Sequence, residues 1–426
     1  MNDTNDLLAT VVDFGSSSVK SGHSGESTPR VFLNSSVGVK AKNGKLDSGE
    51  NGLVFTSKNH EILTDIGGAP ASTLLMNPYG GGDDIDLTNG GDSLMTKIFD
   101  LSMSEMFQDS SSVSDHPLLF IDRCSSSPDQ RTKLAEILFE SCKIPALFLG
   151  RDAVMSCYAC GRSTGVVVDV GGSSTTVTPV FEGWAESSLR SPVGGNFMDD
   201  HFLSILDKKA GKPVLPRYLA KVDSSKRSKL INDADPSYHA YMRMVTGRYA
   251  KEIIAKVASF GYSPTSPSHE TLIKQTYALP DGTSVDIGTE RYDTGEVLFG
   301  HESVARSELV HDTFGSSDPI QNLVCDAVFA CPRDHQASLL STVVLSGGGS
   351  CIPGIVDRLR LETENIIHAH TPGWRVKVLA PATTERRICS WLGGSIVASL
   401  SGFTENWVTK KEYDEQGAAG ILRKCP

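Results

Sequence analysis

Two segments of this chain follow one plan, and this repetition constrains the fold more than any other feature of the sequence. Segments 11–18 and 167–174 each consist of an apolar run, an aspartate, and a turn of glycine and serine. An apolar run that ends in such a turn is typical of a buried β-strand. Two copies, separated by predicted helices, indicate a duplicated unit and an α/β fold class.

Strands and helices are predicted to alternate between and after the two copies. Pro128 and the serines before it predict the start of an amphipathic helix. Gly161 is expected to end a helix that begins at Asp152. The predicted helices cover 128–143, 152–160, 353–360 and 389–400, and the predicted strands cover 7–14, 146–149, 165–171, 175–181, 342–345 and 374–379.

Glycine and serine turns after strands suit phosphate groups, because backbone N–H groups can approach closely and hydroxyls add donors. The turn residues in question are Ser16, Ser17, Ser18, Gly171, Gly172, Ser173 and Ser174. Asp13 and Asp169 precede the turns, and such carboxylates can hold the water molecules of a Mg²⁺ ion. A third glycine run, 347–349, would let a bulky ring lie against bare backbone. Each turn alone is typical of an ordinary loop, but the three together predict nucleotide binding.

Composition and charge narrow the class of partner. The chain has 40 Lys and Arg against 51 Asp and Glu, a net charge of −11, so direct nucleic-acid binding is not expected, whereas a basic partner such as a histone is allowed. No apolar stretch approaches the ~20 residues of a membrane span, and the polar N-terminus does not resemble a signal peptide. The 9 scattered cysteines indicate reduced thiols in the cytosol or nucleus.

Two short pairs could in principle ligate a metal ion. Cys157 and Cys160 form a C-x-x-C, and His368 and His370 form an H-x-H. Neither pair has further ligands at a metal-binding spacing, so we interpret them as core thiols and surface histidines.

The C-terminal third of the chain resembles actin and the actin-related proteins. The matching segments are 385–400, 411–415 and 423–426, with support from 116–119, 161–165, 277–282 and 345–354. The resemblance extends over about 8–426 and is weak at 40–110, 205–245 and 300–335. It implies the two-lobed actin-like fold, shared with Hsp70 and sugar kinases and like ribonuclease H in its α/β units, with a nucleotide cleft between duplicated domains.

The resemblance also implies a division into lobes. The outer, smaller lobe would consist of 1–159 plus 389–426, and the inner, larger lobe of 160–388, with insertions near 205–245 and 262–275. Within the family, segments 191–197, 238–242, 385–391 and 423–426 are most similar to the nuclear, fourth class found in chromatin-remodelling and histone-acetyltransferase complexes. That class implies a nuclear location with some cytoplasmic protein. It also implies partnership with actin and a helical segment of a remodelling ATPase or acetyltransferase complex, with histones as a further candidate.

The family's site residues carry over position by position, and they imply ATP or ADP with Mg²⁺ as the ligand. Asp13 and Asp169 match the aspartates on the metal side, where contact is through water, and Lys20 matches a phosphate-contacting lysine. The turns described above match the two phosphate loops and the adenosine loop of Gly347, Gly348 and Gly349. Lys251, Glu252 and Arg387 match adenine-side contacts. The matches to the groove where partner helices dock are Tyr158, Gly161, Ser163, Glu182, Gly183, Val397, Leu400 and Gly402.

Four departures from the family pattern bear on activity. Asp152 and Thr176 stand where actin has the glutamine and histidine that position the attacking water. Losing both groups should remove most of the acceleration of phosphoryl transfer, so the resemblance implies a nucleotide-binding protein that is not an enzyme, with at most very slow hydrolysis. Asp152 is instead expected to cap a helix. Ser17 replaces a glycine, and Ile352 replaces an aromatic residue and is expected to keep an apolar contact with adenine.

Two other functions are compatible with the fold. A cytoskeletal actin-like protein would assemble with ATP, and a sugar-kinase-like enzyme would phosphorylate a small molecule. The missing water-positioning pair and the polar segment 40–60 disfavour the first, and the actin-like C-terminus disfavours the second.

Overall fold

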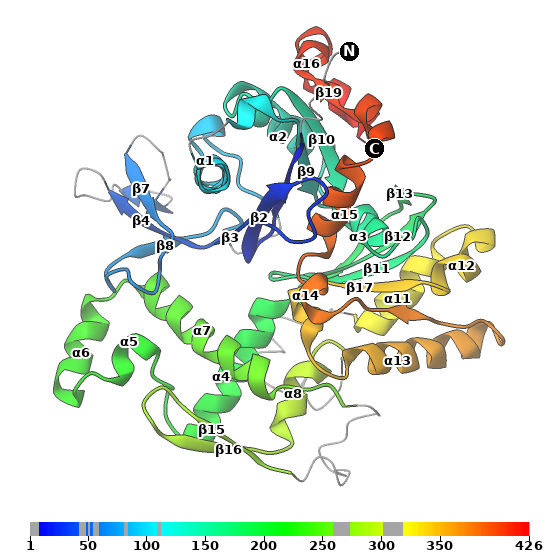
Figure 1. Ribbon diagram of the computed structural model, residues 1–426. Coiled ribbons are helices and arrows are strands. Elements are labelled where there is room, and N and C mark those ends of the chain that lie inside the picture. The colour runs from blue at the N-terminus through cyan, green and yellow to red at the C-terminus, as the bar shows by residue number, and fades with distance from the viewer. Residues whose placement is uncertain are drawn as a thin grey trace.

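The computed structural model describes residues 8–41, 48–49, 52–53, 59–80, 84–108, 112–258, 273–300 and 318–425. Two six-stranded mixed sheets form its centre, and helices cover them (Figure 1). This arrangement confirms the predicted α/β class.

The first sheet has the strand order β19-β10-β9-β1-β2-β3. Its strands are β1 (Thr10–Phe14), β2 (Ser18–His23), β3 (Val31–Asn34), β9 (Leu118–Asp122), β10 (Ala146–Arg151) and β19 (Val408–Thr409). The helices α1 (Leu94–Phe107) and α2 (Pro128–Glu140) bury their apolar faces with this sheet in one core cluster. The C-terminal helices α16 (Lys410–Gln416) and α17 (Ile421–Lys424) lie beside it (Figure 1), and Tyr413 and Ile421 complete that cluster.

The second sheet has the order β13-β12-β11-β17-β18, and β14 pairs with β12. Its strands are β11 (Gly165–Val170), β12 (Thr175–Phe181), β13 (Trp184–Ala185), β14 (Leu189–Ser191), β17 (Val343–Ser346) and β18 (Val378–Leu379). A second core cluster joins it to α11 (Ile320–Phe329), α12 (Arg333–Leu340) and α13 (Ile355–His370).

The two sheets share a local plan, as the repeated sequence predicts. In the first, β1 pairs antiparallel with β2 and parallel with β9, and in the second, β11 pairs antiparallel with β12 and parallel with β17. The turns match as well: Gly15 N donates to Ser18 O over 3.1 Å, and Gly171 N donates to Ser174 O over 2.9 Å. The duplicated α/β unit is therefore confirmed.

Two helices hold the sheets together. α3 (Asp152–Ala159) and α15 (Cys389–Ala398) pack closely and lie between the two sheets in Figure 1. A Cβ atom on Gly393 of α15 would lie 1.8 Å from the carbonyl oxygen of Met155 on α3, so the helices touch backbone to backbone. Trp391, which is fully buried, donates from Nε1 to Val11 O over 3.0 Å and so ties α15 to β1.

The remaining elements surround this centre. α4 (Gly195–Ala210) and α7 (Pro236–Ile254) pack against each other (Figure 1). The other elements are α5 (Arg217–Ala220), α6 (Ser224–Asp233), α8 (Glu290–Glu296), α14 (Thr383–Arg386), β4 (Val37–Ala41), β5 (Ser48–Gly49), β6 (Gly52–Leu53), β7 (His60–Leu63), β8 (Leu74–Met76), β15 (Gln275–Ala278), β16 (Ser284–Ile287), and the 3-10 helices Gly90–Asp92, Val113–Asp115, Gly348–Cys351, Ser401–Asn406 and Ala418–Gly420.

Most predicted elements form, with shifted ends. The strand predicted over 374–379 is the main error, because only Val378 and Leu379 pair with β17. The helix predicted over 353–360 is longer than expected, since α13 runs to His370. The predicted insertion near 205–245 is helical, whereas 262–275 lies almost entirely outside the described residues. The division into lobes at 159 and 389 stays a prediction. Among the helices of the described ranges, none combines the length and apolar character that a bilayer crossing requires.

We expect Gly393→Ala to lower the free energy of unfolding by about 2–4 kcal/mol, because the new methyl group would push α15 away from α3. Gly402→Ala is the matched control: a Cβ there would meet no heavy atom within 4 Å, and a change within about 0.5 kcal/mol is expected. Urea unfolding followed by circular dichroism measures both. Equal midpoints for the two variants would show that the helix contact tolerates a side chain.

Candidate functional site

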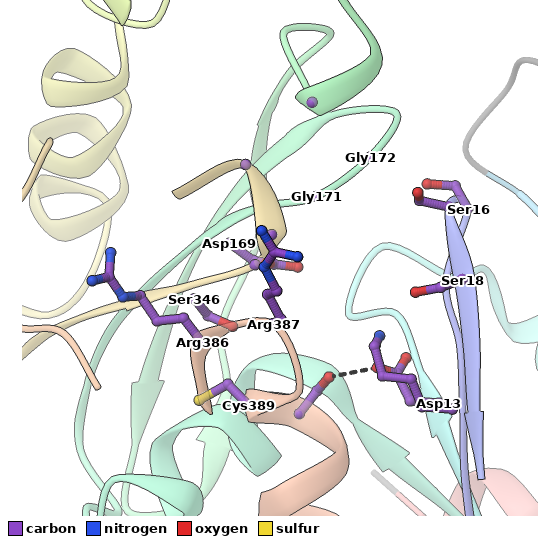
Figure 2. A pocket seen from close by; sticks show the side chains of 18 of the residues that line it. Asp13, Ser16, Ser18, Asp169, Gly171, Gly172, Ser346, Arg386, Arg387 and Cys389 are labelled. Atoms are coloured by element: carbon purple, nitrogen blue, oxygen red, sulfur yellow. Dashed lines mark hydrogen bonds and ion pairs between the residues drawn. The ribbon is translucent and has the colours of Figure 1, made fainter. Parts of the chain in front are cut away.

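A cavity lies between the facing edges of the two sheets. It has a volume of about 300 Å³, and Figure 2 shows Asp13, Ser16 and Ser18 on one wall, facing Asp169 and Gly171 on the other. The parallel pairs explain this position. Asp13 on β1 lies opposite Ile121 on β9 in the first sheet, and Asp169 on β11 lies opposite Ser346 on β17 in the second. Ligands commonly bind at the carboxyl ends of such strands.

Most of the predicted ligand-contacting residues line this one cavity. They are Asp13, Ser16, Ser17, Ser18, Lys20, Asp169, Gly171, Gly172, Lys251, Glu252, Gly347, Gly348, Gly349 and Arg387. Ser173 and Ser174 complete the second turn but are not among the residues that line the cavity. The binding roles of all these residues stay predictions.

The first turn is held by polar contacts around Asp13. Lys20 lies opposite Asp13 across the β1–β2 pair, and its Nζ atom is 2.7 Å from Asp13 Oδ2. Ser390, near the start of α15, donates to the same oxygen over 3.1 Å. Asp13 therefore has its charge balanced by Lys20 and its position fixed from α15.

The second turn contacts the first directly. Ser173 N donates to Ser16 Oγ over 3.1 Å, which links the two predicted phosphate loops. Behind the second turn, Gly195 N donates to Gly171 O over 2.8 Å and Asn196 N donates to Gly172 O over 2.9 Å. The N-terminus of α4 thus supports the second turn, and its first two residues, Gly195 and Asn196, also line the cavity.

The glycine run at 347–349 fits tightly against the second sheet. Gly347 has φ of +86°, and a Cβ there would lie 2.2 Å from Asp169 Oδ1. A Cβ on Gly348 would meet nothing within 4 Å. Glycine is required at position 347 by its backbone conformation and by the nearby carboxylate, and only Gly348 leaves open space for a ring.

Three carboxylates share the floor of the cavity, and their repulsion appears in a pKa. Burial, followed by the charges of Asp152 and Asp13, raises the pKa of Asp169 to about 7, against the opposing effect of Arg123 and Lys20. A cation among these groups would relieve the repulsion. No group of three or more His, Cys, Asp or Glu side chains in the described part of the chain is arranged to hold a metal ion directly.

The predicted adenine-side residues are bound to protein partners. Lys251 Nζ lies 2.6 Å from Asp199 Oδ1 and donates to Gly195 O over 3.3 Å. Arg387 Nη2 lies 3.3 Å from Glu252 Oε1, and both side chains are largely exposed at the cavity's edge. An exposed pair of this kind contributes little to stability.

Several cavity residues carry no pattern that would have marked them in the sequence. Arg248 of α7 lies 2.7 Å from Asp199 of α4, two helices whose packing brings these residues together. Arg386 donates to Ser350 O over 2.7 Å and so supports the glycine run. The cavity residues not predicted include Phe32, Asn34, Arg123, Asn196, Asp199, Arg248, Arg386, Cys389 and Ser390.

Two of the departures from the family pattern lie away from the cavity. Thr176 is on β12 opposite Asp169 and does not line the cavity. Ile352 is buried in the second core cluster and is not among the residues that line the cavity, and its expected apolar contact with adenine stays a prediction. Its side chain fills a core position.

Asp152 does line the cavity, but its predicted capping position is wrong by one residue. It is the first residue of α3, and the N-cap is Arg151. Asp152 Oδ1 nonetheless accepts hydrogen bonds from Ala153 N over 2.7 Å and from Cys124 N over 3.0 Å. The carboxylate is therefore anchored to backbone amides.

The predicted docking groove is partly assembled. Gly183 N donates to Ser163 O over 2.8 Å, and a Cβ on Gly183 would lie 2.4 Å from the hydroxyl of Tyr158. Val397 is buried in the core, whereas Leu400 is 56% exposed. Gly161 and Glu182 lie in turns, and Gly402 lies in the 3-10 helix Ser401–Asn406.

The structure shows the surroundings of the cysteine pair and the histidine pair that could in principle ligate a metal ion. Cys157 is fully buried and Cys160 is half-buried, as expected for core thiols. His368 and His370 are exposed on α13 and contact the backbone oxygens of Trp374 and Ile366.

A comparison with protein-family models decides the family. The actin family model matches residues 4–426. The chain belongs to the actin family. Its two sheets of one plan and the cavity between them are consistent with the actin-like two-lobed fold, so the predicted fold is confirmed.

Three curated relatives of this actin-family chain illustrate its similarity to proteins named actin-related protein 4. It is similar to actin-related protein 4 of Oryza sativa subsp. indica, with 31% identity over 449 residues and 99% of both chains covered. It is likewise similar to actin-related protein 4 of Arabidopsis thaliana, with 31% identity over 463 residues and 99% of both chains covered. For actin-related protein 4 of Yarrowia lipolytica the identity is 27% over 436 residues, covering 98% of this chain and 96% of the relative.

We expect Gly347→Ala to lower the free energy of unfolding by about 2 kcal/mol or more, because alanine disfavours positive φ and its methyl group would contact Asp169. Gly348→Ala, one residue away, should change it by less than about 1 kcal/mol. Thermal unfolding without nucleotide compares the two. A similar loss in both variants would contradict the special role of position 347.

Proposed function

We propose that this chain is a nuclear actin-related protein that serves as a structural, ATP-binding subunit of chromatin-remodelling or histone-acetyltransferase complexes. The full-length similarity to proteins named actin-related protein 4 supports the class, together with the class-like segments at 385–391 and 423–426. We expect most of the protein in the nucleus and some in the cytoplasm.

The observation that carries the proposal is the composition of the cavity. Turns of glycine and serine meet three carboxylates and Lys20 in a cavity of about 300 Å³. Backbone amides and hydroxyls suit phosphates, and a Mg²⁺ ion held through water would balance Asp13 and Asp169. When bound, Mg²⁺ supplies positive charge between the carboxylates and the phosphates.

The same cavity argues against turnover. Asp152 occupies the water-positioning place, and one of its oxygens is bonded to Cys124 N and Ala153 N. A fixed anion beside a terminal phosphate neither orients water in line nor stabilises the developing charge. The chain would therefore hold nucleotide as a ligand that joins the two lobes, with at most very slow hydrolysis.

The proposed partners are actin and a helical segment of a remodelling ATPase or acetyltransferase complex. The helix would contact Tyr158 and Gly183, which lie close together, and the exposed Leu400. Leu400 and Trp184, which is 62% exposed, offer apolar surface there. The net charge of −11 favours a basic protein such as a histone over nucleic acid as a further partner.

We expect Mg²⁺-ATP to raise the melting temperature while phosphate release stays near background. Binding to the folded state alone stabilises by about 2.7 kcal/mol at a hundredfold excess over Kd. Asp169→Ala should remove the shift, and Asp326→Ala, at an exposed position of α11, should keep it. Melting curves and a phosphate-release assay on one sample test this. The proposal would be contradicted if Mg²⁺-ATP left the wild-type melting temperature unchanged, or if ATP hydrolysis were as fast as that of conventional actin.

We expect the protein not to form filaments by itself. A filament needs a contact that repeats from one copy of the chain to the next without closing into a ring. The segment 40–50, which matches the part of actin that inserts into the next subunit, is polar and charged and offers few apolar anchors. Much of this segment lies outside the described residues, so the expectation rests on sequence. Sedimentation with Mg²⁺-ATP at high protein concentration is the test. A nucleotide-dependent pellet would favour the cytoskeletal alternative.

A further inference from the structure

Arg123 lies on the cavity wall, although no sequence pattern marks it. It follows directly after β9, and Asp152 follows directly after β10. Asp13 on β1 is opposite Ile121 on β9, and Asp122 on β9 is opposite Arg151 on β10. Because these three strands are parallel neighbours, the first turn, Arg123 and Asp152 meet at one edge of the first sheet.

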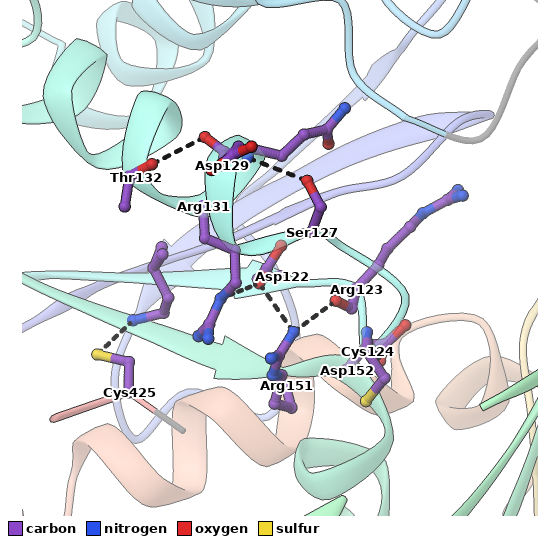
Figure 3. Close-up of polar contacts among 12 residues, drawn as sticks. Asp122, Arg123, Cys124, Ser127, Asp129, Arg131, Thr132, Arg151, Asp152 and Cys425 are labelled. Carbon is purple, nitrogen blue, oxygen red and sulfur yellow. Dashed lines mark hydrogen bonds and ion pairs between the residues drawn. The ribbon is translucent and has the colours of Figure 1, made fainter. Parts of the chain in front are cut away.

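The surroundings of Arg123 direct its side chain towards the first turn. Its guanidinium group lies 4.8 Å from the ring centroid of Tyr79, and the Tyr79 hydroxyl donates to Phe14 O at the end of β1. Arg151 Nη1 donates to Arg123 O over 3.0 Å, which holds the backbone. Figure 3 shows the Arg123 side chain extending away from the ion pairs of Asp122 with Arg131 and Arg151.

The charges of the cavity fall into two groups, and Arg123 belongs to the group around the turns. Those acting on Asp169 are Asp152, Asp13, Arg123 and Lys20. Those acting on Arg248 include Asp199 and Glu252, near the proposed adenine side. Lys20 is already paired with Asp13. Arg123 therefore supplies positive charge at the end of the cavity that contains Asp152.

We propose that Arg123 contacts the terminal phosphate of a bound nucleoside triphosphate and makes the site prefer a triphosphate over a diphosphate. This inference rests on the proposed nucleotide binding. A guanidinium group can bind phosphate oxygens through two parallel hydrogen bonds. Asp152 alone would repel the terminal phosphate, which a diphosphate lacks, and Arg123 on the same edge offsets that repulsion. Arg123 is thus a specificity-determining residue, and it makes the anion at position 152 compatible with a triphosphate.

Isothermal titration of the full chain with Mg²⁺-ATP and with Mg²⁺-ADP tests the proposal. We expect Arg123→Ala to weaken ATP binding by about tenfold or more and ADP binding by less than about threefold, since only the triphosphate loses a charged contact. Arg123→Lys keeps the positive charge but loses the paired N–H donors of the guanidinium group. Its affinity for ATP should lie between those of the wild type and Arg123→Ala. Arg360→Ala is the matched control, because it removes one positive charge from an exposed ion pair on α13. Equal losses for ATP and ADP, or no loss, would overturn the proposal.

A second variant changes Asp152, whose negative charge opposes the positive charge of Arg123 at the terminal phosphate. This test does not depend on the folding of Arg123→Ala. Asp152→Asn removes the repelling charge while keeping an oxygen acceptor for Cys124 N and Ala153 N. It should raise the ratio of ATP to ADP affinity by about threefold or more. The proposal is overturned if neither Asp152→Asn nor Arg123→Lys changes the ratio of ATP to ADP affinity. If the wild-type chain binds neither nucleotide, both this proposal and the proposed function are overturned. If the wild type binds both nucleotides and the Arg123 variants keep the same ratio of ATP to ADP affinity, only this proposal is overturned and the proposed function stands.

Discussion

The backbone contact between α3 and α15 is the constraint on which the rest of the structure depends. Gly393 lies against the carbonyl of Met155, so the helices approach as closely as two backbones can. A shared apolar cluster follows, in which Val11 and Leu119 of the first sheet and Val167 and Val344 of the second pack with these helices. The separation of the two sheets, and hence the width of the cavity between them, is set by this contact (Figure 1).

The same two helices also position the site. α15 brings Ser390 to Asp13, and α3 begins at Asp152, on the wall of the same cavity. The contacts of both carboxylates therefore lie within the predicted outer lobe, 1–159 plus 389–426. In the proposed function a nucleotide would bridge the turns on each side, which already touch through Ser173 and Ser16. Binding and lobe closure would then be one event, with Asp152 kept in place by backbone amides.

Much of the fold follows from local patterns, whereas parts of the site do not. The strands before the two turns were predictable because apolar runs end there in glycine and serine. The helix at Pro128 was predictable because proline and serine define its start. The extended segment 374–377 was mistaken for a strand because periodicity cannot tell whether a partner strand runs alongside. The Asp199 pairs with Arg248 and Lys251 were not predictable, since they depend on how α4 packs on α7.

The sequence by itself determined the duplicated units and the turns with their aspartates, because each depends on residues that are neighbours along the chain. Tertiary structure alone decided which charges share the cavity. Asp13, Arg123, Asp152 and Asp169 come from the ends of four strands, and only the parallel registers and the closeness of α3 to α15 bring them together. The raised pKa of Asp169 has the same origin, since burial and charge repulsion depend on distances in space.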